Sequence, residues 1–282
     1  MNRLRTLVTR ARGVSLGARI PQLANAVLEP LLDRPFGLIH VVEHPKCGGT
    51  WIRNMLRTYN GTQVYLADRL VRPHDVIQTH RLYRPWYRRP LVVVRDPRDL
   101  FVSQYYHDTH YRRREKNLEI ERHFRHDPAR PRREDFGAYL EAKLRLRANP
   151  PFHYGEFVRS WQYRPRACWV RYEDCLADAA AELARIVRWL GLPVDPDRLR
   201  HAVEANRFEN ATLARSGRAR RPGEEDATEF ERKGIAGDWK NHFDRRSCEL
   251  IQRHEGWTLA SLGYEPDASW IERFLAEERG SA

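Results

Sequence analysis

The sequence has few of the residues that mark metal sites, disulfide frameworks or membrane spans. Its four cysteines are scattered, with no Cys-x-x-Cys pair and no clustered histidines. This spacing indicates neither a disulfide framework nor a zinc site. No apolar run approaches the ~18 residues of a membrane span, and the N-terminus lacks the apolar block of a secretory signal. We therefore expect a soluble, cytoplasmic protein without a disulfide framework or a zinc site.

Acidic residues are outnumbered by basic ones. The 282 residues include 50 Lys and Arg against 38 Asp and Glu, a net charge of +12 that comes mostly from arginine. Nucleic acid, an acidic membrane surface or a highly phosphorylated small molecule would each match this charge. With 41% hydrophobic residues the chain can bury one sizeable core, and we expect a single domain over 37–282.

A basic extension at 1–36 precedes this domain. It has no acid before Glu29, and Leu4, Leu7, Val8 and Ala11 are spaced as on one face of a helix. Such a helix could rest on an anionic membrane, but we favour a packed or frayed extension.

A strand, a glycine turn and a helix are predicted next. The apolar run 38–42 is followed by His44-Pro45-Lys46-Cys47-Gly48-Gly49-Thr50-Trp51, and a helical pattern then runs to about Tyr59, before the stop signal Asn60-Gly61. Adjacent glycines let the backbone approach a ligand, N–H groups at a helix start favour an anion, and Lys46 adds a positive charge. The alternative is an ordinary strand-to-helix turn, because the lysine precedes the glycines, unlike in the common nucleoside-triphosphate loop.

His80 ends a short, partly apolar strand predicted over 76–80. In an open parallel sheet, ligands collect at the carboxyl ends of the strands, so this histidine is well placed for chemistry. A partly exposed histidine without a role is the alternative.

Arg95 follows a buried-strand run at 91–94. Asp96 is expected to cap the next helix, with Pro97 at its first position, where the missing N–H does no harm. Ser103 falls two turns along on the face that carries the cap, so Arg95 and the Ser103 hydroxyl could bind one anion. A solvated arginine and a surface serine are the alternative.

Strand and helix patterns alternate along the rest of the chain. The charged stretch 107–149, with an insert at 111–133, indicates a solvated loop outside the sheet and then a helix from Asp135. This alternation predicts an α/β fold with a central parallel sheet flanked by helices. We expect a strand at 168–172 and helices at 154–163, 177–190, 197–205 and 245–262.

The segment 212–228 is polar and broken by glycine and proline, which predicts a flexible loop. It leads to Arg232-Lys233-Gly234, where two charges and backbone donors offer a second grip on an anion. We expect the loop to be mobile without a ligand and to order above the site when the anion binds, which would exclude water.

Four segments, in their order along the chain, resemble motifs of the cytosolic-type sulfotransferases. By this resemblance we expect the chain to be a bacterial-like member of that family. Pro45 to Trp51 is similar to the family's P-K-S-G-T-T-W loop, with Cys47 and Gly49 replacing a serine and a threonine. The family's K-T-H segment is similar to Gln78-Thr79-His80, where Gln78 replaces a lysine with an assisting role.

The other two segments match more fully. Arg95 to Ser103 resembles the R-[ND]-P-x-D-x-x-V-S motif without a mismatch, and Arg232 to Lys240 reproduces R-K-G-x-x-G-D-W-K. The family's cofactor-contacting tyrosine before E-D corresponds to Tyr172, and its phenylalanine in the following helix-to-loop segment looks like Phe208.

The resemblance implies a reaction and a site. Family members move a sulfuryl group from 3′-phosphoadenosine 5′-phosphosulfate to an acceptor hydroxyl or amine, leaving 3′,5′-diphosphoadenosine, with no metal. His80 would be the general base, Lys46 would stabilise the bridging oxygen, and Ser103 would hold Lys46 away until the acceptor binds. The cofactor-binding residues implied are Lys46, Cys47, Gly48, Gly49, Thr50, Trp51, Arg95, Ser103, Tyr172, Phe208, Arg232, Lys233 and Gly234.

Two other functions stay open. A nucleotide kinase would need a lysine at the end of the glycine loop and an acid for magnesium. A nucleic-acid-binding module would use the net charge, although acids interrupt the arginine clusters. For a sulfotransferase we expect a small-molecule, sugar or lipid acceptor and no nucleic acid, while the acceptor's identity and a homodimer are left open.

Overall fold

The computed structural model describes residues 28–62, 71–111, 133–147 and 150–281. The helix expected around Leu4 to Ala11 lies outside these residues, and so does most of the charged insert at 111–133. A helical segment over 28–36 leads directly into the sheet.

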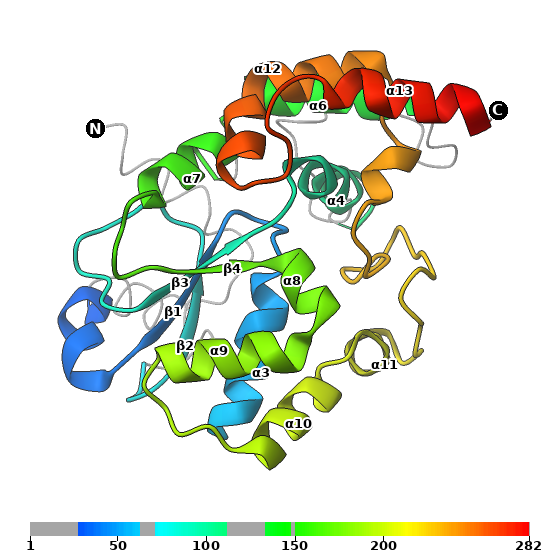
Figure 1. Ribbon diagram of the computed structural model, residues 1–282. Helices are drawn as coiled ribbons and strands as arrows, with labels where there is room; N and C mark the ends of the chain where they lie inside the picture. Colours follow the sequence, from blue (N-terminus) through cyan, green and yellow to red (C-terminus); the bar gives the residue numbers. More distant parts are fainter. Residues whose placement is uncertain (1–27, 63–70, 112–132, 148–149, 282) are drawn as a thin grey trace, which may run out of the picture.

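The centre of the fold is a sheet of four parallel strands, in the order β2-β1-β3-β4 (Figure 1). The register pairs Val42 with Thr79 on one side and with Val92 on the other, so the carboxyl ends of the strands meet at one edge. The predicted α/β fold with a central parallel sheet is confirmed. The strands are β1 (Ile39–Glu43), β2 (Val76–Thr79), β3 (Pro90–Val94) and β4 (Cys168–Arg171).

The direction of the chain across the sheet changes between β1 and β3. After β1, helix α3 (Gly49–Asn60) leads to β2 on one side, whereas β3 pairs on the other side of β1 and leads into α4 (Pro97–Thr109). A crevice forms outside the carboxyl ends of the strands at such a switch point. The segments that follow β1 and β3 are therefore the ones placed to bind a ligand.

Helix α3 agrees with its predicted span of 50–59 to within one residue at each end, and α4 begins at the predicted position. Gly61 ends α3 in the left-handed conformation with φ of 65°. Asp96 caps α4 by accepting the N–H of Arg98 at 2.8 Å, and Pro97 takes the first helical position. Asp99 lies in the first turn of α4, where an acid is favourable. Its carboxylate also accepts the N–H groups of Gly237 and Trp239, which are far away in the sequence.

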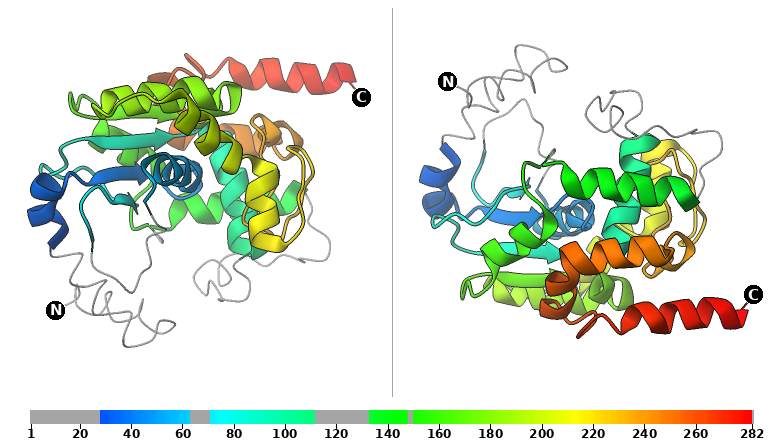
Figure 2. Two further views of the ribbon diagram at one scale, coloured as in Figure 1. Left: turned by 90° about the horizontal axis from the view of Figure 1, so that it is seen from below. Right: turned by 90° about the horizontal axis from the view of Figure 1, so that it is seen from above.

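The other helices form two groups, one with α3 and one with α4 (Figure 1). They are α6 (Arg133–Arg145), α7 (Tyr154–Trp161), α8 (Tyr172–Ala177), α9 (Ala179–Trp189), α10 (Pro196–Ala205), α11 (Phe208–Ser216), α12 (Arg245–Ser261) and α13 (Trp270–Ser281), with the 3-10 turn η2 (Asp238–Asn241). Helix α3 packs on β1 and β2 and against α10, and α9 packs on β4. Helix α12 packs on α4, α6 and α7, and Figure 2 shows α13 beside it on the outside.

One helix prediction and one loop prediction were wrong in part. The helix predicted over 177–190 is α9, which begins two residues later because the carboxylate of Asp178 accepts the N–H groups of Ala180 and Ala181 and caps it. The short helix α8 before it was not predicted. The loop predicted from residue 212 begins later, since α11 continues to Ser216. Thr212 is buried there and its hydroxyl accepts the N–H of Arg220, so tertiary contacts outweigh the polar composition.

Candidate functional site

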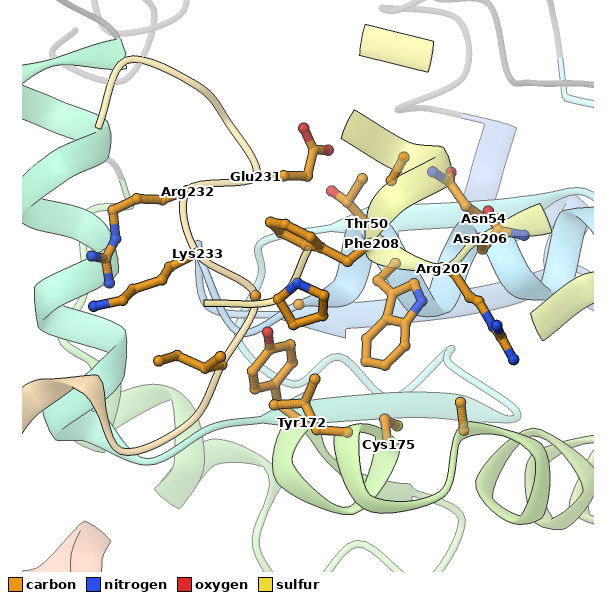
Figure 3. Close-up of a pocket in the computed structure, with 18 of the residues that line it drawn as sticks. Thr50, Asn54, Tyr172, Cys175, Asn206, Arg207, Phe208, Glu231, Arg232 and Lys233 are labelled. Atoms are coloured by element: carbon orange, nitrogen blue, oxygen red, sulfur yellow. The ribbon is translucent and has the colours of Figure 1, made fainter. Parts of the chain in front are cut away.

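A cavity of about 440 Å³ lies at the carboxyl edge of the sheet, where segments from distant parts of the sequence meet (Figure 3). Its walls come from the turn after β1, the start of α4, α8, α11 and the segment around Arg232. Most of the predicted cofactor-binding residues line it. These are Lys46, Gly48, Thr50, Trp51, Arg95, Ser103, Tyr172, Phe208, Arg232, Lys233 and Gly234.

The side chain of Lys46 is held by Phe230, two residues before Arg232. Its ammonium donates to the carbonyl oxygen of Phe230 at 3.3 Å and lies 3.8 Å from the centroid of that ring. Burial, followed by the charge of Arg95, lowers the pKa of Lys46 to about 8. Ser103 is also on the cavity wall, but the atom that holds the ammonium in this structure is the Phe230 carbonyl oxygen.

Arg95 spans the switch point of the sheet. Its Nη1 donates to the carbonyl oxygen of Lys46 and its Nη2 to that of Ile235, both at 3.3 Å, while the guanidinium lies 4.4 Å from the centroid of the Tyr172 ring. Its Nε is buried and has no hydrogen-bond partner among the described residues. Because an unpaired buried donor is costly, this N–H indicates a place for an additional acceptor.

Two aromatic rings project into the middle of the cavity, Tyr172 and Phe208 (Figure 3). Each ring packs directly against a glycine that has a positive φ. A Cβ on Gly48 would lie 2.6 Å from Tyr172, and one on Gly234 would lie 2.4 Å from Phe208. Trp51 meets Tyr172 edge to face, with 6.0 Å between the ring centroids. The cavity thus offers flat apolar faces between its cations.

Arg232 and Lys233 extend side by side toward α4 (Figure 3). Both bind the carboxylate of Asp238, at 2.5 Å and 2.6 Å, and Arg232 also binds Glu225 at 2.5 Å. Burial opposes ionisation of Asp238, but the hydrogen bond from His242 and the charge of Arg232 hold its pKa well below the usual range. The two cations are therefore held in place by a carboxylate that stays ionised near neutral pH.

Asp99 joins this cationic segment to the start of α4. Its carboxylate accepts the N–H of Gly237 at 2.6 Å and that of Trp239 at 2.9 Å. Helix α4 begins just after Arg95. These bonds therefore fix the position of the segment 232–239 relative to Arg95, at the edge of the cavity.

Three predicted site residues lie off the cavity wall. Cys47 is fully buried in the core, which raises the pKa of its thiol, so only its backbone could face a ligand. The N–H of Gly49 donates to the carboxylate of Glu43 at 2.6 Å. His80 is exposed, and its Nδ1 lies 3.1 Å from the carbonyl oxygen of Glu43.

That last contact determines the tautomer of His80. A carbonyl oxygen can only accept a hydrogen bond, so the Nδ1 of a neutral imidazole must carry the proton. Its Nε2 then has a free lone pair, which is the form that a general base requires.

Four residues of the site were missed by sequence reasoning: Glu43, Arg220, Phe230 and Asp238. Glu43 could have been found as an acid that ends a buried apolar strand directly before the glycine turn, and Asp238 as the acid within the R-K-G-x-x-G-D-W-K match. Arg220 and Phe230 carry no local signal, because their roles depend on contacts with other segments.

Arg220 organises the segment between α11 and Arg232. Its side chain is 4% exposed and donates to the carbonyl oxygens of Glu224 at 3.0 Å, Arg232 at 2.8 Å and Glu231. The backbone adds two bonds, from Gly223 to Lys233 and from Asp226 to Arg232. Residues 217–231 therefore wrap around one buried guanidinium.

The described residues include no group of three or more His, Cys, Asp or Glu side chains that could hold a metal ion. No helix among them is long and apolar enough to cross a membrane.

Comparison with known protein families identifies the family of this chain. The model of the sulfotransferase domain matches residues 88–263, which include Arg95 to Ser103 and Arg232 to Lys240. The chain belongs to this family. The match does not extend to the glycine turn after β1.

Curated sulfotransferases are similar to parts of this sulfotransferase-family chain. Human sulfotransferase 1C2 is 29% identical over 109 residues, which cover 35% of this chain and 37% of the relative. Mouse sulfotransferase 2B1 is 28% identical over 173 residues, or 57% of this chain and 45% of the relative. The chain thus matches between about a third and a half of their length. These relatives are mammalian and give no support to the bacterial-like part of the prediction.

Solved structures share the fold at low sequence identity. Mouse sulfotransferase SULT7A1, complexed with PAP, superimposes with a TM-score of 0.56 at 21% identity, over 77% of this chain and 84% of that one. Retinol dehydratase, in complex with androsterone and inactive cofactor PAP, gives 0.56 at 18% identity, over 86% and 85%. They confirm the α/β architecture of the family.

Proposed function

We propose that this protein transfers a sulfuryl group from 3′-phosphoadenosine 5′-phosphosulfate to an acceptor hydroxyl or amine. The observation that carries the proposal is the meeting of Lys46, Arg95 and the Arg232-Lys233 pair around one cavity with two aromatic rings. Cations at separate points suit a ligand with two anionic groups, and flat apolar faces between them suit a base. Membership of the sulfotransferase family and the PAP in the related structures support this assignment.

The residues present fit such a nucleotide. The cavity has the size of a small-molecule site. The unpaired Nε of Arg95 offers a donor for the 3′-phosphate, next to Ser103, Arg232 and Lys233. Tyr172, Phe208 and Trp51 would pack around the adenine, and the turn from Lys46 to Thr50 would hold the 5′ end. When bound, the nucleotide supplies the sulfuryl group and a phosphate leaving group.

The side chains of this protein would then perform the remaining work. We assign His80 the role of general base, since its Nε2 carries the lone pair that can accept the acceptor's proton. Lys46 has a pKa of about 8 and so is mostly charged at pH 7, which lets it stabilise negative charge that develops on the leaving oxygen. Ser103 remains our proposal for a restraint on Lys46 during the cycle, in addition to Phe230.

The acceptor is proposed only by class: a small molecule, a sugar or a lipid. Androsterone in the retinol dehydratase structure illustrates one small molecule that binds a related fold. We further propose that 37–282 forms the catalytic domain and that the protein acts in the cytoplasm, as its resemblance to the cytosolic-type sulfotransferases implies.

Two measurements test the proposal. Transfer of labelled sulfate from the labelled donor into a panel of alcohols, phenols, sugars, lipids and amines should give at least one labelled product. Binding to immobilised 3′,5′-diphosphoadenosine should resist competition by ATP. Elution by equimolar ATP would instead favour a kinase, and elution by short nucleic acids at moderate salt would favour a nucleic-acid-binding module.

A further inference from the structure

Glu43 places a carboxylate on the anion-binding turn. It is the last residue of β1, and both of its oxygens are hydrogen bonded. Oε2 accepts the N–H of Gly49 at 2.6 Å, and Oε1 accepts the side-chain amide of Gln78. The residue is only 3% exposed, yet it forms part of the cavity wall beside Lys46.

The N–H of Gly49 is one of the donors that a bound anion would use. It is the first N–H of α3, and such groups have no partner within the helix. A carboxylate that already satisfies this donor competes with any ligand oxygen for it. The contact is tight, because a Cβ on Gly49 would lie 2.5 Å from the Glu43 carboxyl carbon.

The donors to Glu43 do not cancel its charge. The backbone N–H of Gly49 and the amide of Gln78 are both neutral. Arg53 is nearby, but its Nη1 donates to the oxygen of Gln78 at 2.7 Å, so Gln78 stands between the two charges. Thr50 shares the same amide through its hydroxyl. Lys46 and Arg53 interact electrostatically with Glu43, but within the described residues neither forms an ion pair with it. The carboxylate of Glu43 therefore lies, without a directly paired cation, beside the turn where the 5′ group of the nucleotide would lie.

We propose that Glu43 is a specificity-determining residue, which weakens binding of highly charged 5′ groups at the turn and so favours release of the product nucleotide. This inference rests on the proposed function. In the donor the two negative charges of the 5′ group are divided, one on the phosphate and one on the sulfate, whereas in the product the phosphate alone carries close to two, as its second pKa lies near 6. Repulsion between Glu43 and a phosphate at the turn grows with the charge on that phosphate, so it acts more strongly on the phosphate of the product than on that of the donor.

The test compares Glu43→Gln with the parent protein, using three adenosine nucleotides as probes in calorimetric titrations. We expect 3′,5′-diphosphoadenosine and adenosine 5′-monophosphate to bind the variant about tenfold more tightly, because the neutral amide keeps the shape and removes the repulsion. Adenosine 3′-monophosphate should change less than twofold. Glu249→Gln is the matched control, since Glu249 is exposed on α12, away from the cavity, and its neutralisation should leave all three affinities unchanged.

A second variant keeps the test decisive if Glu43→Gln folds poorly. Gln78→Lys leaves Glu43 in place but puts a cation on its Oε1, so it too should tighten binding of the 5′-phosphate probes. Weaker 5′ binding in both variants would show that Glu43 only positions the turn, and equal gains for all three probes would show a general charge effect. Either result overturns the inference. If the parent binds no adenosine nucleotide, the proposed function itself fails, which is a separate outcome.

Discussion

The backbone of Gly234 lies directly against the ring of Phe208. A Cβ at position 234 would come within 2.4 Å of Cδ2 of that ring, and the φ of 67° is one that other residues rarely adopt. Gly48 has the same relationship to Tyr172 across the cavity, with a φ of 99°. Both glycines allow an aromatic side chain of the site to sit against the backbone of an anion-binding segment.

Gly234→Ala should therefore lower stability and nucleotide affinity together. Gly237→Ala is the control, since its φ of 82° imposes the same backbone strain while its Cβ would enter open space. We expect the control to cost ~1–2 kcal/mol in the free energy of unfolding and Gly234→Ala to cost more. Chemical denaturation measures both. Equal losses would mean that the ring moves aside without penalty.

His80→Ala should abolish transfer and leave nucleotide affinity nearly intact. The loss in turnover is expected at ~10²–10⁴-fold, because the imidazole accepts the acceptor's proton and lies off the nucleotide cavity. His201→Ala, on the exposed surface of α10, is the matched control. Initial rates with saturating donor provide the measurement, and a turnover within threefold of the parent would remove His80 from the mechanism.

Arg95→Ala should weaken the binding of 3′,5′-diphosphoadenosine by ~1.5–3 kcal/mol, as expected for the loss of hydrogen bonds to a charged group. Adenosine 5′-monophosphate lacks the 3′-phosphate and should bind the parent poorly and the variant about equally. Arg95→Lys should recover only part of the affinity, because lysine keeps the charge but not the planar fork. If both nucleotides lost the same affinity, Arg95 would not be the 3′-phosphate contact.

Binding of 3′,5′-diphosphoadenosine should slow hydrogen exchange across 216–233. Residues 217–231 are held around the Arg220 guanidinium and end at the Arg232-Lys233 pair that would grip the nucleotide. Arg220→Ala should therefore raise exchange in this segment without nucleotide and weaken binding, with exchange in β3 as an internal control. Unchanged exchange at saturating nucleotide would refute the proposed lid.

The contribution of Glu255 to the stability of the protein should fall as pH rises from about 5 to 7. Glu255 is buried between α7 and α12, where it accepts the N–H of Gly155 and the hydroxyl of Thr258, and burial raises its pKa to about 7. Between the unfolded value and 7 the folded state keeps a proton that the unfolded state has lost, so the raised pKa destabilises the fold as pH rises.

Glu255→Gln should flatten this dependence by about 1–3 kcal/mol, because an amide imitates the protonated acid. The buried His40 has a raised pKa and adds to the fall, whereas burial lowers the pKa of His44 to about 3 and opposes it. Both histidines are present in both proteins, so their effects cancel in the comparison. Urea denaturation at pH 5.5 and pH 8 provides the measurement. Parallel curves for the parent and the variant would contradict the role of Glu255.

Local patterns were enough to predict the frame of this site. The strand at β3, the Asp96 cap and the Gly61 stop follow from apolar runs and capping residues that act within a few positions of the chain. The turn from Lys46 to Thr50 and the Arg95 tip could be placed at one edge, since parallel strands align their carboxyl ends. Motif matches then indicated which side chains face the ligand.

Other features were decided only by tertiary structure. Three contacts could not be predicted from positions in the sequence. They are the hydrogen bond from Gly49 to the carboxylate of Glu43, the bonds from the Arg220 guanidinium to the segment around it, and the ion pairs of Asp238. The helical form of 212–216 depends on the burial of Thr212 in the same way. Helix capping and hydrophobic periodicity involve residues close together in the chain, so they can be predicted from the sequence. The pairing of charges and the burial of polar groups depend on which surfaces the folded chain brings together.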